Sequence, residues 1–170
     1  MRYGYFKHHI FNLAAALMVF TNNAYSQTAD TSLTTKVTPL VHIIYMGGND
    51  CPPCVVWRAL ELPKLEKSDE FKSFKFSFVT KSVRSAVPSS IFLPVEVKPY
   101  KQKLDYATGG RGGSSQTVLM ADGEVYHHFY GSRTAEQYVN MALAIQNGTP
   151  FPESRCTRRN QTSCVEAPKP

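Results

Sequence analysis

The stretch "LVHIIYMGGNDCPPCVVW", residues 40–57, carries the strongest structural signal in this 170-residue chain. It begins with an apolar run, residues 40–46, which is broken only by His42 and is typical of a strand buried on both faces. Two glycines then end the run. We expect His42 to be hydrogen-bonded near the start of the strand rather than to bind a metal, because no second ligand lies nearby in sequence.

A Cys-Pro-Pro-Cys motif, residues 51–54, follows the glycines. Proline suits the first positions of a helix, because the N–H groups there have no partner within the helix. Pro52 and Pro53 therefore predict a helix that begins at the motif and holds the two sulfurs close. The positive end of the helix favours a thiolate, the attacking species in disulfide exchange. We expect Cys51, the exposed sulfur nearer the open end, to be the nucleophile and Cys54 to be the resolving thiol.

The first 26 residues have the order of regions found in a secretory signal peptide. A basic segment, residues 1–9, precedes an apolar run of 11 residues, 10–20, and small residues follow up to Ser26. A membrane-spanning helix needs about 20 residues, so we expect cleavage after Ser26 and no stable membrane anchor. The protein would then be exported, to the periplasm in a bacterium and otherwise out of the cell. Residues 27–38 are polar and predict a flexible leader.

The charge of the chain is moderately basic. Its formal net charge is +6, and loss of the first 26 residues, which contain Arg2 and Lys7 but no acid, leaves +4. These charges are scattered along the sequence, so they do not indicate a nucleic-acid partner.

Features around the motif leave its chemistry open. The carboxylate of Asp50 raises the pKa of a neighbouring thiol, and Pro52 has no N–H to offer the Cys51 sulfur, so we expect a moderate thiol pKa. A permanent structural clip is one alternative, although closing so short a loop stabilises little. A zinc or copper site completed by Cys156 and Cys164 is another, which their spacing and the oxidising conditions outside the cell disfavour.

The second cysteine pair, Cys156 and Cys164, lies in a basic tail, residues 149–170. A disulfide there would close a segment that has little to bury, and the chain-entropy estimate of its stabilisation is about 2–3 kcal/mol. We expect this disulfide to be structural. The alternative is a second redox pair that exchanges electrons with Cys51 and Cys54.

A helix is expected after the motif. Its apolar face, at helical spacing, comprises Val55, Val56, Ala59 and Leu60, and Leu62 and Leu65 extend it. Pro63 must kink or interrupt this helix, because it removes one backbone hydrogen bond and crowds the preceding turn. Trp57 either lines the substrate face beside the motif or packs in the core.

The later sequence predicts strands, a hairpin and a closing helix. Residues 72–80 alternate between apolar and polar, which predicts a strand with one packed face. Residues 116–131 predict two strands around an Asp-Gly turn. A capping box at Thr134 and Gln137 begins the last helix, and Gly148 ends it.

The order of these elements resembles the thioredoxin superfamily. A CxxC between a strand and a helix, the later "ELPKLEK", and the closing hairpin and helix carry the resemblance, which covers roughly residues 38–148. It implies an α/β, thioredoxin-like fold over residues 39–148. In that fold a central mixed sheet is flanked by helices, and the CxxC lies at the N-terminus of the first core helix. The resemblance also implies that Cys51 attacks and Cys54 resolves.

The chain departs from the family at three places, one of which is the longer first helix, with Pro63 nine residues past Cys54. The family usually carries a cis-proline just before the strand that opens the hairpin, where it presents backbone to the substrate. The corresponding residues here are Ser114, Ser115 and Gln116, and none is proline. Family members also often have a buried acid before the CxxC, where this chain has Ile44 and Tyr45. The missing proline concerns substrate binding more than thiol chemistry.

Two functions remain open from the sequence. The first is an exported thiol–disulfide oxidoreductase that acts on protein thiols and disulfides, with a redox partner that resets the CxxC and no bound cofactor or metal. The second is a thioredoxin-like binding module without turnover, which docks a partner in an export or assembly apparatus. The missing proline and the glycine-rich loop at residues 109–113 favour the second.

Overall fold

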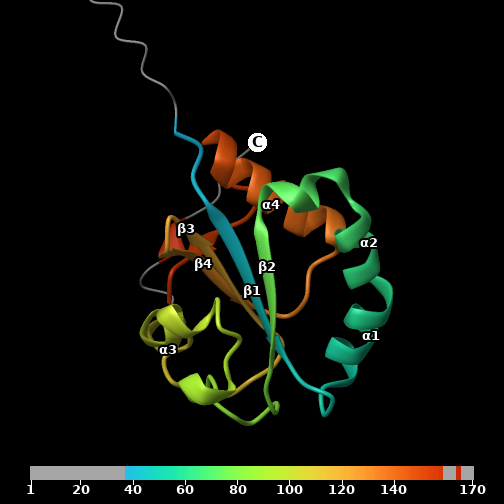
Figure 1. Ribbon diagram of the computed structural model, residues 1–170, viewed down its shortest axis with the longest axis vertical. Coiled ribbons are helices and arrows are strands. Elements are labelled where there is room, and N and C mark those ends of the chain that lie inside the picture. The colour runs from blue at the N-terminus through green and yellow to red at the C-terminus, as the bar shows by residue number, and fades with distance from the viewer. Residues whose placement is uncertain (1–36, 159–163, 166–170) are drawn as a thin grey trace, which may run out of the picture. The chain divides into compact units, whose positions relative to one another are not determined.

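Four strands form one mixed sheet in the order β2–β1–β3–β4 (Figure 1). The strands are Val41–Gly47 (β1), Lys75–Thr80 (β2), Gln116–Ala121 (β3) and Glu124–Tyr130 (β4). β1 pairs in parallel with β2 and antiparallel with β3, and β3 pairs antiparallel with β4. This computed structural model describes residues 37–158 and the backbone of residues 164–165. The predicted signal peptide and nearly all of the predicted leader lie outside the described residues.

Helices cover both faces of the sheet. They are Pro52–Leu60 (α1), Leu62–Lys67 (α2), Lys101–Thr108 (α3) and Ala135–Asn147 (α4), with short 3-10 turns at Asp69–Ser73 (η1), Ser90–Phe92 (η2) and Lys98–Tyr100 (η3). Alternate residues of β1 point to opposite faces. Ile43 and Tyr45 pack in the larger core with residues of α1, α2 and α4. Ile44 and Met46 pack in a smaller core with α3. The predicted α/β architecture, a mixed sheet flanked by helices, is therefore confirmed.

Most elements with strong local signals form as the sequence predicts. The Thr134 hydroxyl accepts the Gln137 N–H and the Gln137 side chain accepts the Thr134 N–H, which completes the capping box at the start of α4. Gly148 ends that helix with a left-handed φ of 64°. The hairpin between β3 and β4 turns at Asp122 and Gly123, which have φ of 49° and 79°. The predicted interruption near Pro63 is confirmed, because α1 ends at Leu60 and α2 begins at Leu62.

The predicted apolar face reaches the core in α2, where Leu65 is fully buried and Leu62 packs against the core, but its α1 part is not a core face. Val55, Val56 and Leu60 are 41%, 56% and 59% exposed. The residues of α1 that are buried are Cys54 and Trp57, three positions apart and therefore on one side of the helix. The large indole ring of Trp57 fills the space between α1 and the sheet, so the valines and the leucine are left at the surface.

Candidate active site

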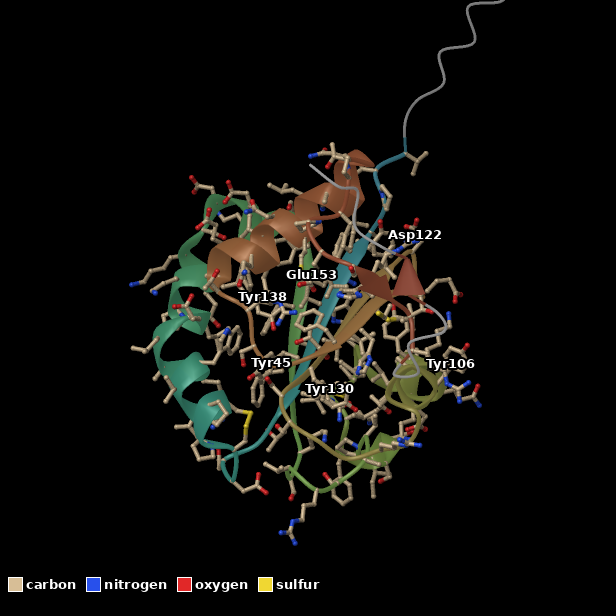
Figure 2. The ribbon with its side chains drawn as sticks, turned by 180° about the vertical axis from the view of Figure 1, so that it is seen from behind. Tyr45, Tyr106, Asp122, Tyr130, Tyr138 and Glu153 are labelled. Carbon is tan, nitrogen blue, oxygen red and sulfur yellow. A yellow bond between two sulfur atoms is a disulfide. The ribbon has the colours of Figure 1, made fainter. Side chains whose placement is uncertain are left out.

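The Cys-Pro-Pro-Cys motif forms a disulfide between Cys51 and Cys54 at the junction of β1 and α1 (Figure 2). Cys51 is the N-cap of α1, and Pro52 and Pro53 occupy its first two positions. The prediction that the prolines mark the start of a helix is therefore confirmed. The Cys51 sulfur lies 3.3 Å from the Cys54 N–H nitrogen and accepts its hydrogen bond. The same N–H also donates to the Cys51 carbonyl oxygen at 2.9 Å, so it is shared between the backbone and the sulfur that we expect to be the nucleophile.

Both cysteines lie just beneath the surface. Cys51 is 2% exposed and Cys54 is fully buried, so the expectation of an exposed Cys51 is wrong for the disulfide-bonded state. The neighbouring residues Asn49, Asp50, Pro52 and Pro53 are exposed and form the surface over the disulfide. Below it, Gly47 ends β1, and a Cβ there would lie only 3.1 Å from the Cys54 sulfur and 2.9 Å from the Tyr45 ring. The strand can pass this close to the disulfide because position 47 has no side chain.

The loop before β3 reaches the motif from the other side. The hydroxyl of Ser114 lies 3.1 Å from the Cys54 sulfur. The peptide bond between Ser114 and Ser115 is cis. Gln116 begins β3 and is fully buried, with its side-chain amide donating to the carbonyl of Gly113 at 2.9 Å. Of the three loop residues singled out from the sequence, Ser114 contacts the motif and Gln116 fastens the loop behind it.

A chain of hydroxyl groups lies behind this loop. The hydroxyl of Ser115 lies 2.9 Å from that of Ser132, which in turn lies 3.0 Å from the Tyr45 hydroxyl. These three hydroxyl groups connect the loop before β3 to the loop before α4 and to β1. Sequence reasoning missed Ser132, because nothing in its local pattern connects it with the motif about 80 residues earlier.

Of the two positions that the sequence left open for Trp57, the structure shows packing in the core. Trp57 is 4% exposed and belongs to the larger core, where its ring stacks on that of Tyr45. Its indole N–H donates to the carbonyl oxygen of Arg133 at 2.5 Å. Trp57 also lines a groove beside the motif.

A groove of about 520 Å³ runs beside the motif. One wall comes from α1 and is mainly apolar, and the opposite wall comes from the loops before β3 and α4 and carries hydroxyl groups. The lining residues are Pro53, Val56, Trp57, Leu60, Glu61, Ser114, Ser115, Gly131 and Ser132. The exposed side chains of Val56 and Leu60 and the serine that contacts Cys54 therefore face the same space.

Asp50 ties the turn before the motif to the loop that follows β2. Its carboxylate accepts hydrogen bonds from the Ser82 hydroxyl at 2.7 Å and from the Val83 N–H at 3.1 Å. These two hydrogen bonds lower the pKa of Asp50, which therefore stays charged beside the motif. The backbone packs closely here, because a Cβ on Gly48 would lie 2.2 Å from the carbonyl oxygen of Lys81.

Lys81 is a buried residue that connects the loop after β2 to the loop before β3. It is 3% exposed, and its ammonium group donates to the carbonyl oxygens of Ser85 and Gly113, each at 2.7 Å. Burial lowers the pKa of Lys81, and the negative charge of Asp50 partly opposes that shift. The ammonium group thus fixes the segment just before Ser114.

The second cysteine pair is docked on β4. Cys156 is disulfide-bonded, and its backbone pairs with that of Cys164 in a two-residue ladder of β5 (Arg155–Cys156) and β6 (Cys164–Val165). The side chain of Cys164 lies outside the described residues. The Cys156 N–H donates to the imidazole Nδ1 of His127 at 2.9 Å, and Nε2 of that ring lies 2.8 Å from Glu153. The start of the tail is therefore held to the sheet by a buried histidine.

The described residues offer no group of three or more His, Cys, Asp or Glu side chains that could hold a metal ion. Over the same residues, no helix has the length and apolar character needed to cross a membrane. No protein-family model matches the chain, and no curated protein matches its sequence.

Proposed function

We propose that this protein is a thioredoxin-like thiol–disulfide oxidoreductase that exchanges disulfides with protein substrates through Cys51 and Cys54. The observation that carries the proposal is the position of the disulfide. Its first sulfur caps a helix and accepts a helix N–H, and a groove of about 520 Å³ lies beside it. A mixed sheet flanked by helices, with the CxxC at the first of them, fits the thioredoxin-like fold that the sequence resemblance implies.

The geometry supports attack by Cys51. In the reduced protein, the Cys54 N–H and the positive end of α1 both favour a Cys51 thiolate. That thiolate attacks a substrate disulfide, forms a mixed disulfide with one substrate sulfur and releases the other as a thiolate. The Cys54 thiolate then attacks the Cys51 sulfur, which restores the 51–54 disulfide and releases the second substrate thiolate. Two electrons pass to the substrate, and the reverse sequence oxidises it.

The groove supports a polypeptide substrate. Val56 and Leu60 are more than half exposed and line it on one side, so an apolar side chain next to a substrate cysteine would bury surface against them. The serine hydroxyls opposite offer hydrogen bonds to substrate backbone. The sulfurs themselves carry the electrons, so the reaction requires a redox partner to reset the pair but no bound cofactor.

The proposed place of action follows from the first 26 residues alone. A signal peptide there would send the protein to the periplasm of a bacterium or out of another cell. Protein thiols are oxidised to disulfides in these compartments, and a disulfide-exchanging protein has substrates there.

A binding module without turnover is the second candidate. The observation that favours it is the burial of both cysteines, with Cys51 only 2% exposed. In that case the groove would hold a partner and the disulfide would serve as a clip.

Insulin reduction in the presence of dithiothreitol separates the two candidates. We expect the purified protein to accelerate precipitation of the insulin chains, and Cys51→Ser and Cys54→Ser to abolish the acceleration. Cys54→Ser should accumulate mixed disulfides with substrate proteins, because the resolving thiol is gone. A wild-type protein with no acceleration, whose 51 and 54 thiols resist alkylation until it unfolds, would instead establish the clip.

A further inference from the structure

The two sulfurs of the disulfide have different hydrogen-bond donors. The Cys51 sulfur accepts the backbone N–H of Cys54 at 3.3 Å, whereas the Cys54 sulfur contacts the Ser114 hydroxyl at 3.1 Å. Cys54 is fully buried, so bulk water does not reach it. Any negative charge that forms on this sulfur must therefore be stabilised by the protein.

The direction of the second hydrogen bond follows from the chemistry of the sulfur. A disulfide-bonded sulfur carries no hydrogen, so it can only accept. The hydroxyl proton of Ser114 therefore points at Cys54 in the oxidised protein. The donor is in place before any charge develops, so no reorganisation is needed when it does.

From this geometry we propose that Ser114 is a catalytic residue that stabilises the thiolate of Cys54; the proposal rests on the function proposed above. When a partner thiolate attacks the Cys51 sulfur, the Cys51–Cys54 bond breaks and its electron pair stays on Cys54. The negative charge moves from the incoming sulfur to Cys54, and no proton is transferred. The Ser114 hydroxyl donates to that charge, which lowers the pKa of the leaving thiol and speeds its departure.

The same contact acts in the opposite direction. Resolution of a mixed disulfide requires Cys54 as a thiolate, and a hydrogen bond to the charged form raises the fraction of thiolate at neutral pH. The bond that forms joins Cys54 to Cys51, and the substrate sulfur leaves with the electron pair. Ser114 therefore favours the reactive state of the buried sulfur in both directions.

The surroundings of Ser114 hold the hydroxyl in place. On one side, the carbonyl of Gly113 accepts hydrogen bonds from the Lys81 ammonium and from the Gln116 amide. On the other side, Ser115 is joined to Ser132. Because the backbone on both sides of Ser114 is held, its hydroxyl keeps its orientation toward the Cys54 sulfur when that sulfur becomes charged.

Ser114→Val and Ser114→Thr form the matched pair that tests the proposal, because they have the same shape and differ in one hydroxyl. The first measurement is the pKa of Cys54 in a Cys51→Ser background. It is obtained by monitoring the ultraviolet absorbance of the thiolate as the pH is varied. A hydrogen bond to a charged group corresponds to about 1–2 pKa units, so Ser114→Val should raise the pKa of Cys54 by that amount. Ser114→Thr should restore a value near that of the parent.

The second measurement is the rate at which dithiothreitol reduces the 51–54 disulfide. With the usual dependence of exchange on leaving-group pKa, Ser114→Val should slow reduction by about 3- to 10-fold. Ser90→Ala, an exposed serine in η2, is the control and should leave both the rate and the pKa unchanged.

The outcomes separate this proposal from the proposed function. Equal Cys54 pKa values and reduction rates in the valine and threonine variants would overturn the role of Ser114, even if the wild-type protein reduces insulin. A wild-type protein that does not reduce insulin would overturn the oxidoreductase, whatever the two variants show. If Ser114→Val fails to fold, Ser114→Ala takes its place as the variant without the hydroxyl: a raised Cys54 pKa relative to the parent and to Ser114→Thr supports the proposal, and an unchanged pKa overturns it.

Discussion

The ring of Tyr45 lies flat on the indole of Trp57, with the ring centroids 4.3 Å apart and the ring planes 11° from parallel. Tyr45 comes from β1 and Trp57 from α1, so the stack joins the strand and the helix that hold the disulfide between them. Tyr45 and the second tyrosine of this core, Tyr138, are labelled in Figure 2. Trp57 also contacts Tyr138 edge to face, with the centroids 5.6 Å apart.

Replacement of Trp57 should therefore lower stability strongly. We expect Trp57→Ala to reduce the free energy of unfolding by about 3–5 kcal/mol, because it leaves a cavity between α1 and the sheet. Trp57→Phe keeps an aromatic ring but loses the N–H donated to Arg133, and should cost clearly less. Urea unfolding monitored by circular dichroism measures the unfolding free energies of both variants. Tryptophan fluorescence does not serve here, because the chain has a single tryptophan and both variants lack it. Equal, small losses in the two variants would show that the ring is not part of the core.

The groove predicts a specific effect on large substrates. Val56 and Val55 are adjacent and both exposed, but of the two only Val56 lines the groove. We expect Val56→Asn to raise the KM for insulin several-fold, while the rate of reduction of the disulfide by dithiothreitol stays the same. Val55→Asn is the matched control and should leave both quantities unchanged. Similar KM values in the two variants would place substrate binding outside the groove.

Stability should fall in mild acid because of His42. Its imidazole Nε2 lies 2.9 Å from the hydroxyl of Ser77, which donates to Glu96, and Tyr100 packs edge-on against the ring. Burial lowers the pKa of His42, Lys75 lowers it further, and Glu96 opposes them. The unfolded chain therefore binds the proton more readily than the folded protein, and stability is lost as the pH falls below about 6.5, the ordinary pKa of histidine.

His42→Gln removes the titrating group and keeps a side chain that can hydrogen-bond to Ser77. We expect the difference in unfolding free energy between about pH 7.5 and about pH 5 to be smaller in this variant than in the wild-type protein. Chemical denaturation at the two pH values measures the difference. An unchanged difference would assign the acid sensitivity to other groups.

The tail disulfide should contribute to stability and not to exchange. Cys156→Ser combined with Cys164→Ser should lower the free energy of unfolding by about 2–3 kcal/mol, because the unfolded chain is no longer constrained. Insulin reduction should stay near the wild-type rate. Lost turnover with an unchanged melting temperature would instead show that this pair passes electrons to Cys51 and Cys54.

The sequence predicted best the elements whose signals are local. Two prolines after Cys51, the capping box at Thr134 and the Asp122-Gly123 turn each act within a few residues, and each forms as expected. The exposed face of α1 was not predictable in this way, because one indole ring decides which side of the helix meets the sheet. Tertiary packing overrode the apolar pattern there.

The candidate site was predictable only in its cysteines and in the approximate position of the loop that faces them. Ser114 is 60 residues from Cys54, and their contact depends on how β1 and β3 pair. The burial of Cys51 was missed for the same reason, since the turn that covers it is held by Asp50 and the loop after β2.

The close approach of backbone at residues 47–48 has a consequence for finding distant relatives of this chain. A Cβ at Gly47 would collide with the Tyr45 ring and press on the disulfide, and one at Gly48 would overlap the carbonyl oxygen of Lys81. A chain that shares this geometry and the ring of Tyr45 is therefore expected to carry two glycines, four and three positions before its first cysteine. The pattern Gly-Gly-x-x-Cys-x-x-Cys follows from this packing, and the proposed role of Ser114 adds a small hydroxyl residue just before the strand that opens the hairpin.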